Sequence, residues 1–295
     1  MLRSLFKDAI CCGRTLPLFC ACAFLLILFF HFTPQLTKPA TQNLILSKTY
    51  KVVVFNRVPK TGSTSIVRIF ETLSKRNDFH VYRVAIFNPR QFLNPLSHKA
   101  LVEEVREISQ CSKLLVHGHF FYINLRRFSS TIDHVYINCL RNPLDRLISK
   151  YYFVRFGDNH RPNTQRRGMT NDSLQMQTFE ECRRLVEEYL LVGVLEYFNE
   201  FMELLAYLIP DYLAGIEQTK DVKIGDQPLW HLRKTKSKAP VQQKVREFFK
   251  NNTIWRMEED FYEFAKSEFL SRYQRYKYPP FDRANWRKSV FIRAK

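Results

Sequence analysis

The chain has 295 residues, with 46 Lys and Arg against 28 Asp and Glu, a formal net charge of +18, 45% hydrophobic residues and only 8 Gly. That apolar fraction supports a packed core, so the composition excludes a disordered chain, a collagen-like chain and a small disulfide scaffold. The excess of positive charge indicates a polyanionic partner, such as nucleic acid, anionic lipid or sulfated sugar.

An uncharged apolar stretch lies near the N-terminus, where residues 16–32 read LPLFCACAFLLILFFHF. This length is at the short end of the range for a membrane-spanning helix. Since no clear small-residue cleavage pattern follows, we expect an uncleaved signal anchor, with a cleaved signal peptide or a buried helix as the alternatives. The basic residues before the stretch place residues 1–15 in the cytosol and the chain from residue 33 onward in the lumen.

Short spans suit the thinner membranes of the early secretory pathway. We therefore expect a single-pass type II Golgi membrane protein, in which residues 33–50 form a luminal stem, residues 51–278 the folded domain and residues 279–295 a C-terminal tail. In that compartment nucleic acid is not an expected partner.

Three of the seven cysteines, Cys111, Cys139 and Cys182, lie on the predicted luminal side. An oxidising lumen permits one disulfide at most among them and leaves one thiol over. Their spacing predicts no metal site. Asn171 and Asn251 begin the tripeptides NDS and NNT, which are glycosylation acceptors in a luminal chain.

Strand and helix patterns alternate after residue 50. Apolar or β-branched runs predict strands at residues 51–55, 80–85, 113–117, 134–140 and 189–194. Amphipathic or proline-initiated stretches predict helices at residues 65–73, 98–108, 143–153, 195–208 and 258–276. This alternation predicts an α/β fold with a mostly parallel sheet that helices cover on both faces.

The loop after the first predicted strand reads PKTGSTS, residues 59–65. In a parallel sheet, ligands bind at the carboxyl ends of the strands. Gly62 permits a tight turn there, and amides with nearby hydroxyls at a helix N-terminus can surround a tetrahedral oxyanion. The loop differs from the triphosphate pattern GxxxxGK[ST], because its Lys precedes the Gly. An ordinary helix cap is the alternative interpretation, since Ser and Thr are good N-caps.

Two further strand ends carry candidate functional residues. Arg141 follows the strand at 134–140, and Ser149 lies two turns into the next helix. In isolation, an Arg at such a position is usually a surface charge. His117 and His119 flank a glycine at the end of the 113–117 strand, where two histidines are well placed for a site, although a lone His is more often structural.

Five separated blocks carry a resemblance to a known family: VPKTGSTS, HGHFFYINL, YINCLRNPLDRLISKYYFVRFGD, LVGVLEYFNEFMELL and HLRKT, in this order. Together they resemble the heparan sulfate 2-O-sulfotransferase and uronyl 2-O-sulfotransferase family. The His-Gly-His form and FGDNHRP favour the heparan sulfate branch. The resemblance covers residues 51 to 264 and implies the sulfotransferase fold, a P-loop-like three-layer αβα domain preceded by one transmembrane helix.

The resemblance implies transfer of sulfate from 3'-phosphoadenosine 5'-phosphosulfate to the 2-hydroxyl of hexuronic acid, preferably iduronate, in heparan sulfate, with no metal required. His119 matches the general base, His117 its companion and Lys60 the group that stabilises the leaving phosphate. The residues that match the donor-binding positions are Lys60, Thr61, Gly62, Ser63, Thr64, Ser65, Arg141, Ser149, Thr235 and Lys238. Those that match the substrate-binding positions are Arg57, Arg155, Asp158, Arg161 and Arg166.

Two departures from the family stand out. Between Cys182 and Tyr189 the family carries a longer segment with two disulfides, and the family's C-terminal segment, which contributes to trimer assembly and the acceptor site, is only loosely matched here. These two departures concern how the domain folds, whether it forms a homotrimer and which acceptor it uses. The alternatives are therefore a chondroitin or dermatan uronyl 2-O-sulfotransferase and a non-catalytic glycosaminoglycan-binding protein.

Overall fold

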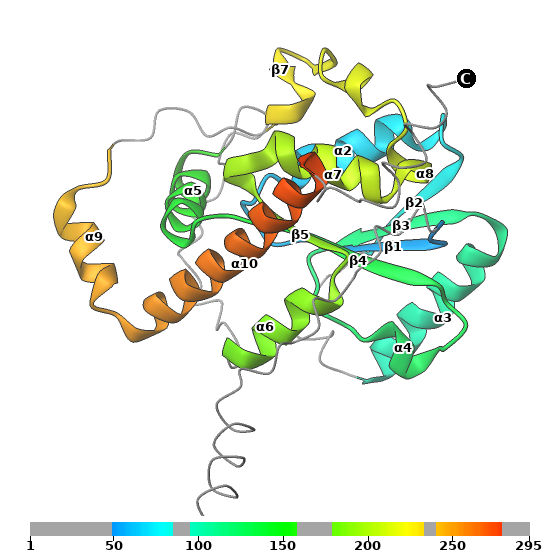
Figure 1. Ribbon diagram of the computed structural model, residues 1–295, viewed down its shortest axis with the longest axis horizontal. Coiled ribbons are helices and arrows are strands. Elements are labelled where there is room, and N and C mark those ends of the chain that lie inside the picture. The colour runs from blue at the N-terminus through cyan, green and yellow to red at the C-terminus, as the bar shows by residue number, and fades with distance from the viewer. Residues whose placement is uncertain (1–48, 85–94, 158–178, 233–239, 279–295) are drawn as a thin grey trace, which may run out of the picture. The chain divides into compact units, whose positions relative to one another are not determined.

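The structure is a computed structural model that describes residues 49–84, 95–157, 179–232 and 240–278 (Figure 1). The chain divides into residues 1–46 and 47–295, and every element below belongs to the second unit. The predicted membrane span at 16–32 and the predicted tails at 1–15 and 279–295 lie outside the described residues. Within the described ranges, none of the helices combines the length and the apolar character needed to cross a membrane.

Five parallel strands form the central sheet in the order β2-β3-β1-β4-β5. Their bounds are β1 Val52–Asn56, β2 Phe79–Arg83, β3 Lys113–Gly118, β4 His134–Leu140 and β5 Leu191–Val194. The predicted parallel sheet is thus confirmed. After β1 the chain continues toward β2 on one side of the sheet, whereas after β4 it continues toward β5 on the other. The carboxyl ends of β1 and β4 therefore form the switch point at which open α/β sheets bind ligands.

Helices cover both faces of this sheet (Figure 1). The α-helices are α2 Ser63–Ser74, α3 Pro95–Cys111, α4 Leu125–Phe128, α5 Pro143–Phe156, α6 Phe179–Glu188, α7 Phe198–Leu208, α8 Pro210–Leu213, α9 Gln243–Lys250 and α10 Thr253–Lys277. The short elements are the 3₁₀ turns η2 Leu195–Tyr197, η3 Ile216–Thr219 and η4 Leu229–His231, and the hairpin of β6 Lys223–Ile224 and β7 Gln227–Pro228.

The core forms two apolar clusters, one on each face of the sheet. Val53 and Phe55 of β1 join the cluster that contains α2, α7 and α8, whereas Val52 and Val54 join the cluster that contains α3 and α4. Successive side chains of a strand point to opposite faces, so a strand covered on both sides reads as a continuous apolar run. This is why KVVVF was recognisable as a strand.

Several elements were not predicted from the sequence: α4, α6, α8, α9 and the β6–β7 hairpin. The predicted helix at 195–208 begins with the 3₁₀ turn η2, and the one at 258–276 begins five residues earlier, at Thr253. The earlier start of α10 has a local cause. Asn252 caps the helix, since its side-chain oxygen accepts a hydrogen bond from the Trp255 N–H at 3.0 Å.

Neither Cys111, which is exposed, nor Cys139, which is buried in β4, forms a disulfide. Burial raises the pKa of the Cys139 thiol, first through desolvation and then through the charge of Glu196. The side chain of Cys182 lies outside the described part of the chain. The one disulfide that the three predicted luminal thiols would permit therefore does not form through Cys111 or Cys139.

Candidate active site

The loop between β1 and α2 turns sharply through two residues with left-handed backbone. Lys60 has φ 67° and Gly62 has φ 76°. A left-handed conformation is costly for a residue with a Cβ, and such strained residues cluster at functional sites. Gly62 is the N-cap of α2, and its carbonyl accepts the Ser65 N–H at 2.9 Å. The turn thus brings the N-terminus of α2, whose first N–H groups have no partner within the helix, to the switch point.

The hydroxyls of this loop hold its shape. Thr61 is fully buried and donates to the Val58 carbonyl at 2.9 Å. The Arg57 guanidinium donates to the hydroxyls of Ser63 and Thr64 at 3.4 and 3.5 Å. Because these hydroxyls already take part in hydrogen bonds, the backbone N–H groups at the start of α2 are the groups of this loop that suit an anion best.

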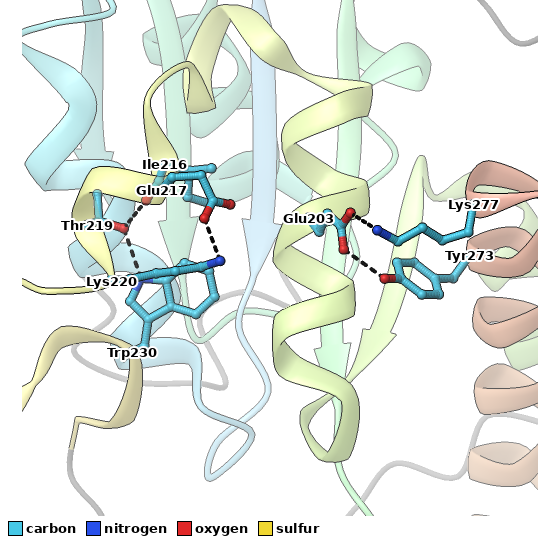
Figure 2. A network of polar contacts seen from close by, with 8 residues as sticks. All are labelled: Glu203, Ile216, Glu217, Thr219, Lys220, Trp230, Tyr273 and Lys277. Carbon is cyan, nitrogen blue, oxygen red and sulfur yellow. Dashed lines mark hydrogen bonds and ion pairs between the residues drawn. The ribbon is translucent and has the colours of Figure 1, made fainter.

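Ser65 connects the loop to a distant segment, because its hydroxyl accepts the Leu232 N–H at 2.9 Å. Just before Leu232, the indole of Trp230 donates to the Thr219 hydroxyl at 2.9 Å, and Thr219 donates to the Ile216 carbonyl at 2.6 Å (Figure 2). This anchor fixes, beside α2, the start of the segment that leads to Thr235 and Lys238, two of the predicted donor-binding residues. Both of these residues lie outside the described residues.

The loop after β4 meets the loop after β1. Arg141 donates through Nη1 to the Lys60 carbonyl at 3.3 Å, and the Lys60 ammonium lies 4.0 Å from the centre of the Phe153 ring of α5. Ser149, on the same helix, is buried. Two of the predicted donor-binding groups, on the β1 side and on the β4 side, are thus brought together.

A carboxylate supports the β4 side of the site. Asn142 caps α5 by accepting the N–H groups of Leu144 and Asp145. The Asn142 N–H donates to Glu196 Oε1 at 2.9 Å, and the Tyr262 hydroxyl donates to Glu196 Oε2 at the same distance. Sequence reasoning missed Glu196, because an acidic residue at a helix start is common without any functional role.

His119 is exposed, and its Nδ1 lies 2.9 Å from the Arg57 carbonyl oxygen. A carbonyl only accepts hydrogen bonds, so Nδ1 carries the hydrogen, and Nε2 of the neutral ring has a lone pair to accept a proton. Neighbouring protein atoms that displace water lower the pKa of His119, the bond to the Arg57 carbonyl raises it, and the charges of Arg57 and Arg83 lower it. The net direction is downward, which favours the neutral ring.

His117 is 2% exposed, and desolvation, followed by the charges of Arg57, Arg83 and His119, lowers its pKa to about 4. Its Nδ1 is buried without a hydrogen-bond partner among the described residues. His117 is therefore neutral near neutral pH and lies beneath the site, as a companion of His119 and not as a second exposed base.

The structure adds a cation that sequence reasoning missed. Arg83 ends β2 and pairs in register with His117, and its charge lowers the pKa of both histidines. An exposed Arg at a strand end looks like a solvated charge in the sequence. Only the position of β2 next to β3 brings it to the histidines.

Most of the remaining predicted residues are not described. Asp158, Arg161, Arg166 and Asn171 lie outside the described residues, as does the side chain of Arg155 in α5. Asn251 is exposed at the end of α9. In the part of the chain that the structure describes, no group of three or more His, Cys, Asp or Glu could hold a metal ion.

The fold is a parallel α/β sheet whose switch point brings together the loop after β1 and the loop after β4, an arrangement that suits an anionic ligand. The model of the family described as "Sulfotransferase family" matches residues 42–260. The chain is 34% identical over 261 residues to the heparin sulfate O-sulfotransferase of Drosophila melanogaster, covering 74% of this chain and 72% of that protein. It is 30% identical over 259 residues to human heparan sulfate 2-O-sulfotransferase 1, covering 74% and 70%. The chain therefore belongs to the heparan sulfate 2-O-sulfotransferase family, as the five sequence blocks indicated.

Proposed function

We propose that this enzyme transfers the sulfuryl group of 3'-phosphoadenosine 5'-phosphosulfate to the 2-hydroxyl of a hexuronic acid, preferably iduronate, in heparan sulfate. The hydroxyl oxygen forms a bond to sulfur while the bond from sulfur to the 5'-phosphate oxygen breaks. The hydroxyl proton passes to His119 Nε2, and adenosine 3',5'-bisphosphate leaves. The reaction needs no metal in this scheme.

The observation that carries the proposal is the 2.9 Å contact between His119 Nδ1 and the Arg57 carbonyl. A sugar hydroxyl is a poor nucleophile, so a base must take its proton as it attacks. The contact commits the hydrogen of the neutral imidazole to Nδ1 and leaves Nε2 as the base. Because the pKa of His119 is lowered, the ring is neutral at the near-neutral pH of the secretory pathway.

Lys60 and Arg141 are assigned to the donor. Charge builds on the bridging oxygen of the leaving phosphate, and the Lys60 ammonium, which a four-carbon stem carries out from the loop, can stabilise that charge. The contact of Arg141 with the Lys60 carbonyl supports a role for Arg141 and Ser149 at the 3'-phosphate, next to the loop that holds the 5'-phosphosulfate. We assign Thr235 and Lys238 to the same donor on the basis of the family resemblance.

Charge supports a polyanionic acceptor. The chain carries a net charge of +18, and the guanidinium groups of Arg57 and Arg83 act on both active-site histidines. Guanidinium groups pair with carboxylate and sulfate in two-point fashion. The names of the relatives support heparan sulfate as the polymer. Arg155, Asp158, Arg161 and Arg166 are proposed to extend the acceptor site.

The proposal includes a compartment. We assign the chain to the Golgi membrane as a single-pass type II protein with the catalytic domain in the lumen, on the basis of the apolar stretch at 16–32. Asn171 and Asn251 are its proposed glycan acceptors. A homotrimer is proposed by family resemblance alone.

The experiment that tests the function is labelled sulfate transfer by the purified full-length chain in detergent. The acceptor is N-sulfated heparosan without other sulfates, chondroitin and dermatan run in parallel, and disaccharide analysis locates the label. Label on the uronate 2-position of heparosan supports the proposal. Label mainly on chondroitin or dermatan would show that the acceptor is not heparan sulfate. No label from a folded chain that still binds adenosine 3',5'-bisphosphate would contradict the proposed transfer activity.

His119→Gln tests the base, and His134→Gln is its matched control. His134 is also a histidine whose Nδ1 contacts a carbonyl, that of Ile132 at 2.7 Å, but it lies at the amino end of β4. Losing a general base costs roughly 10²–10⁴-fold in turnover. We expect that loss in His119→Gln and near-normal turnover in His134→Gln, and equal turnover in the two variants would show that His119 is not the base.

A further inference from the structure

Three successive backbone carbonyls leave the end of β1, and each accepts a hydrogen bond from a different side chain. The donors are Asn138 Nδ2 to the Asn56 carbonyl, His119 Nδ1 to the Arg57 carbonyl and Thr61 Oγ1 to the Val58 carbonyl, each at 2.9 Å. Asn138 belongs to β4, His119 to the segment after β3, and Thr61 to the loop between β1 and α2. This short stretch of backbone therefore connects three parts of the site.

The donor from β4 belongs to a buried polar cluster. Asn138 and Asn56 are 6% and 9% exposed. Asn138 Nδ2 also lies 3.2 Å from Asn56 Oδ1, which accepts the Tyr189 hydroxyl at 2.9 Å, while Asn138 Oδ1 accepts the Cys139 N–H at 2.8 Å. Buried amides are costly unless they are hydrogen-bonded, and these are. Such polar groups in otherwise apolar strands are expected where function requires them.

The peptide unit between Asn56 and Arg57 is held at both of its polar atoms. Its carbonyl accepts from Asn138, and its N–H donates to the Gly118 carbonyl at 2.7 Å. A peptide unit is planar, so fixing both atoms fixes its orientation. The direction of the next carbonyl, that of Arg57, then depends on few remaining torsions, and His119 binds to that carbonyl.

We propose that Asn138 is a positioning residue for His119. It holds the Asn56–Arg57 peptide so that the Arg57 carbonyl faces His119 Nδ1, and it thereby keeps the hydrogen of the neutral imidazole on Nδ1 and the lone pair on Nε2. The tautomer of a histidine is set by the hydrogen bond that one ring nitrogen makes. This inference rests on the proposed function for the role of His119 as base, but the tautomer can be measured without any turnover.

Without Asn138, the Asn56 carbonyl loses its donor, and only the bond from the Arg57 N–H to the Gly118 carbonyl still orients this peptide. The bond between His119 and the Arg57 carbonyl weakens, and neutral histidine then favours its other tautomer, with the hydrogen on Nε2. That tautomer has no lone pair where the substrate proton must arrive. The pKa of His119 also falls further, because the bond to the Arg57 carbonyl is the contribution that raises it.

The test compares Asn138→Ala with Tyr212→Phe in the full-length chain labelled with ¹⁵N in its histidines. Tyr212 is a matched control, because its buried hydroxyl contacts the carbonyls of Tyr50 and Lys51 at 3.1 and 2.9 Å, next to the amino end of β1. The ¹⁵N shifts of the imidazole report which nitrogen carries the hydrogen, and His119→Gln assigns the signal. We expect the Nδ1–H form in wild type and Tyr212→Phe and a shift toward the Nε2–H form in Asn138→Ala.

Kinetics give the second readout. We expect Asn138→Ala to lose on the order of 10- to 100-fold in kcat, the cost of a misplaced catalytic group, with its affinity for adenosine 3',5'-bisphosphate within about twofold of wild type. The acid limb of its kcat/KM profile should move to lower pH. Tyr189→Phe, which keeps the packing, gives a smaller shift in the same direction if Asn138→Ala does not fold.

The outcomes are separable. An Nδ1–H form that persists in a folded Asn138→Ala or Tyr189→Phe variant, or an acid limb that stays in place while only the melting temperature falls, overturns the positioning role. If the wild-type chain transfers no sulfate, the proposed function fails, and the tautomer measurement still decides whether Asn138 positions His119.

Discussion

The two ends of the central sheet are built differently, although the same strands form both. At the amino end, the Tyr212 hydroxyl lies within hydrogen-bond distance of backbone groups of Tyr50, Lys51 and Leu114. The Lys113 ammonium donates to the carbonyls of Asn77 and Asp211 at 2.8 and 3.1 Å. The polar side chains here bind backbone groups at the start of the strands, so this end serves stability.

At the carboxyl end, polar side chains hold other functional groups in place. Lys60 sits in a left-handed conformation, His117 is buried and neutral, and His119 is oriented by a carbonyl. Of these features, the left-handed Lys60 and the buried His117 Nδ1, which has no hydrogen-bond partner among the described residues, cost stability. The comparison teaches that matched substitutions at the two ends should separate turnover from stability.

The sharpest test of this separation uses two lysines, one near each end of the sheet, whose ammonium groups lie over aromatic rings. Lys60→Met should lower turnover by about 10²–10³-fold, because a group that stabilises transition-state charge is lost. Lys113, whose ammonium is 5.9 Å from the Tyr212 ring centre, is the amino-end counterpart. Lys113→Met should lower the melting temperature and leave turnover unchanged. A similar loss of turnover in both variants would end the distinction between the two ends.

His117 predicts the pH dependence of stability. Its pKa is lowered to about 4 in the folded chain, whereas an unfolded histidine has a pKa of about 6.5. Between these values the unfolded chain binds more protons, so stability is fully present above pH 6.5 and falls as the pH drops toward 4. The difference corresponds to about 3 kcal/mol. Urea unfolding of wild type and His117→Gln from pH 7 to pH 4 measures it, and equal slopes would contradict the prediction.

Tyr212→Phe tests the amino end alone. Removing the hydroxyl removes its buried hydrogen bonds to the backbone of Tyr50 and Lys51, and such a bond contributes about 0.5–1.5 kcal/mol. We expect that loss in urea unfolding, with kcat and KM as in wild type. A changed KM at normal stability would mean that this end also shapes the site.

Two carboxylates allow the smallest effect to be tested. Glu196 accepts the Asn142 N–H at the donor side, whereas Glu203 of α7 accepts the Tyr273 hydroxyl and pairs with Lys277 away from it (Figure 2). Glu196→Gln should weaken binding of adenosine 3',5'-bisphosphate by about tenfold or less, since one charge-assisted hydrogen bond is weakened. Glu203→Gln should leave that affinity unchanged in calorimetric titration. Equal affinities in both variants would remove Glu196 from the donor side.

The parallel sheet and the residues at its strand ends were predictable because local patterns encode them. Parallel strands covered on both faces read as apolar runs such as KVVVF, and PKTGSTS and HGH stand at their ends. The helix α6 was not predictable, because among its described side chains, residues 183–188, only Leu185 and Val186 pack against the core.

The supports of the site were hidden for a different reason. Asn138 is a turn-forming residue type inside a strand, and its role depends on β4 lying beside β1. Likewise, the orientation of His119 depends on a backbone carbonyl sixty-two residues away in the chain. Contacts to backbone leave no mark on the identity of the residue that accepts them, so no local pattern reveals them.

Two cysteine thiols in the described part of the chain can report how often the sheet opens, because one is exposed and the other is buried. Cys111, the last residue of α3, is exposed to solvent. Cys139 lies in β4 next to Asn138, fully buried, and its thiolate is disfavoured there. A thiol reagent therefore reaches Cys139 only when β4 separates from its neighbours, so the rate at which that cysteine is labelled reports how often the catalytic end of the sheet comes apart in the native protein.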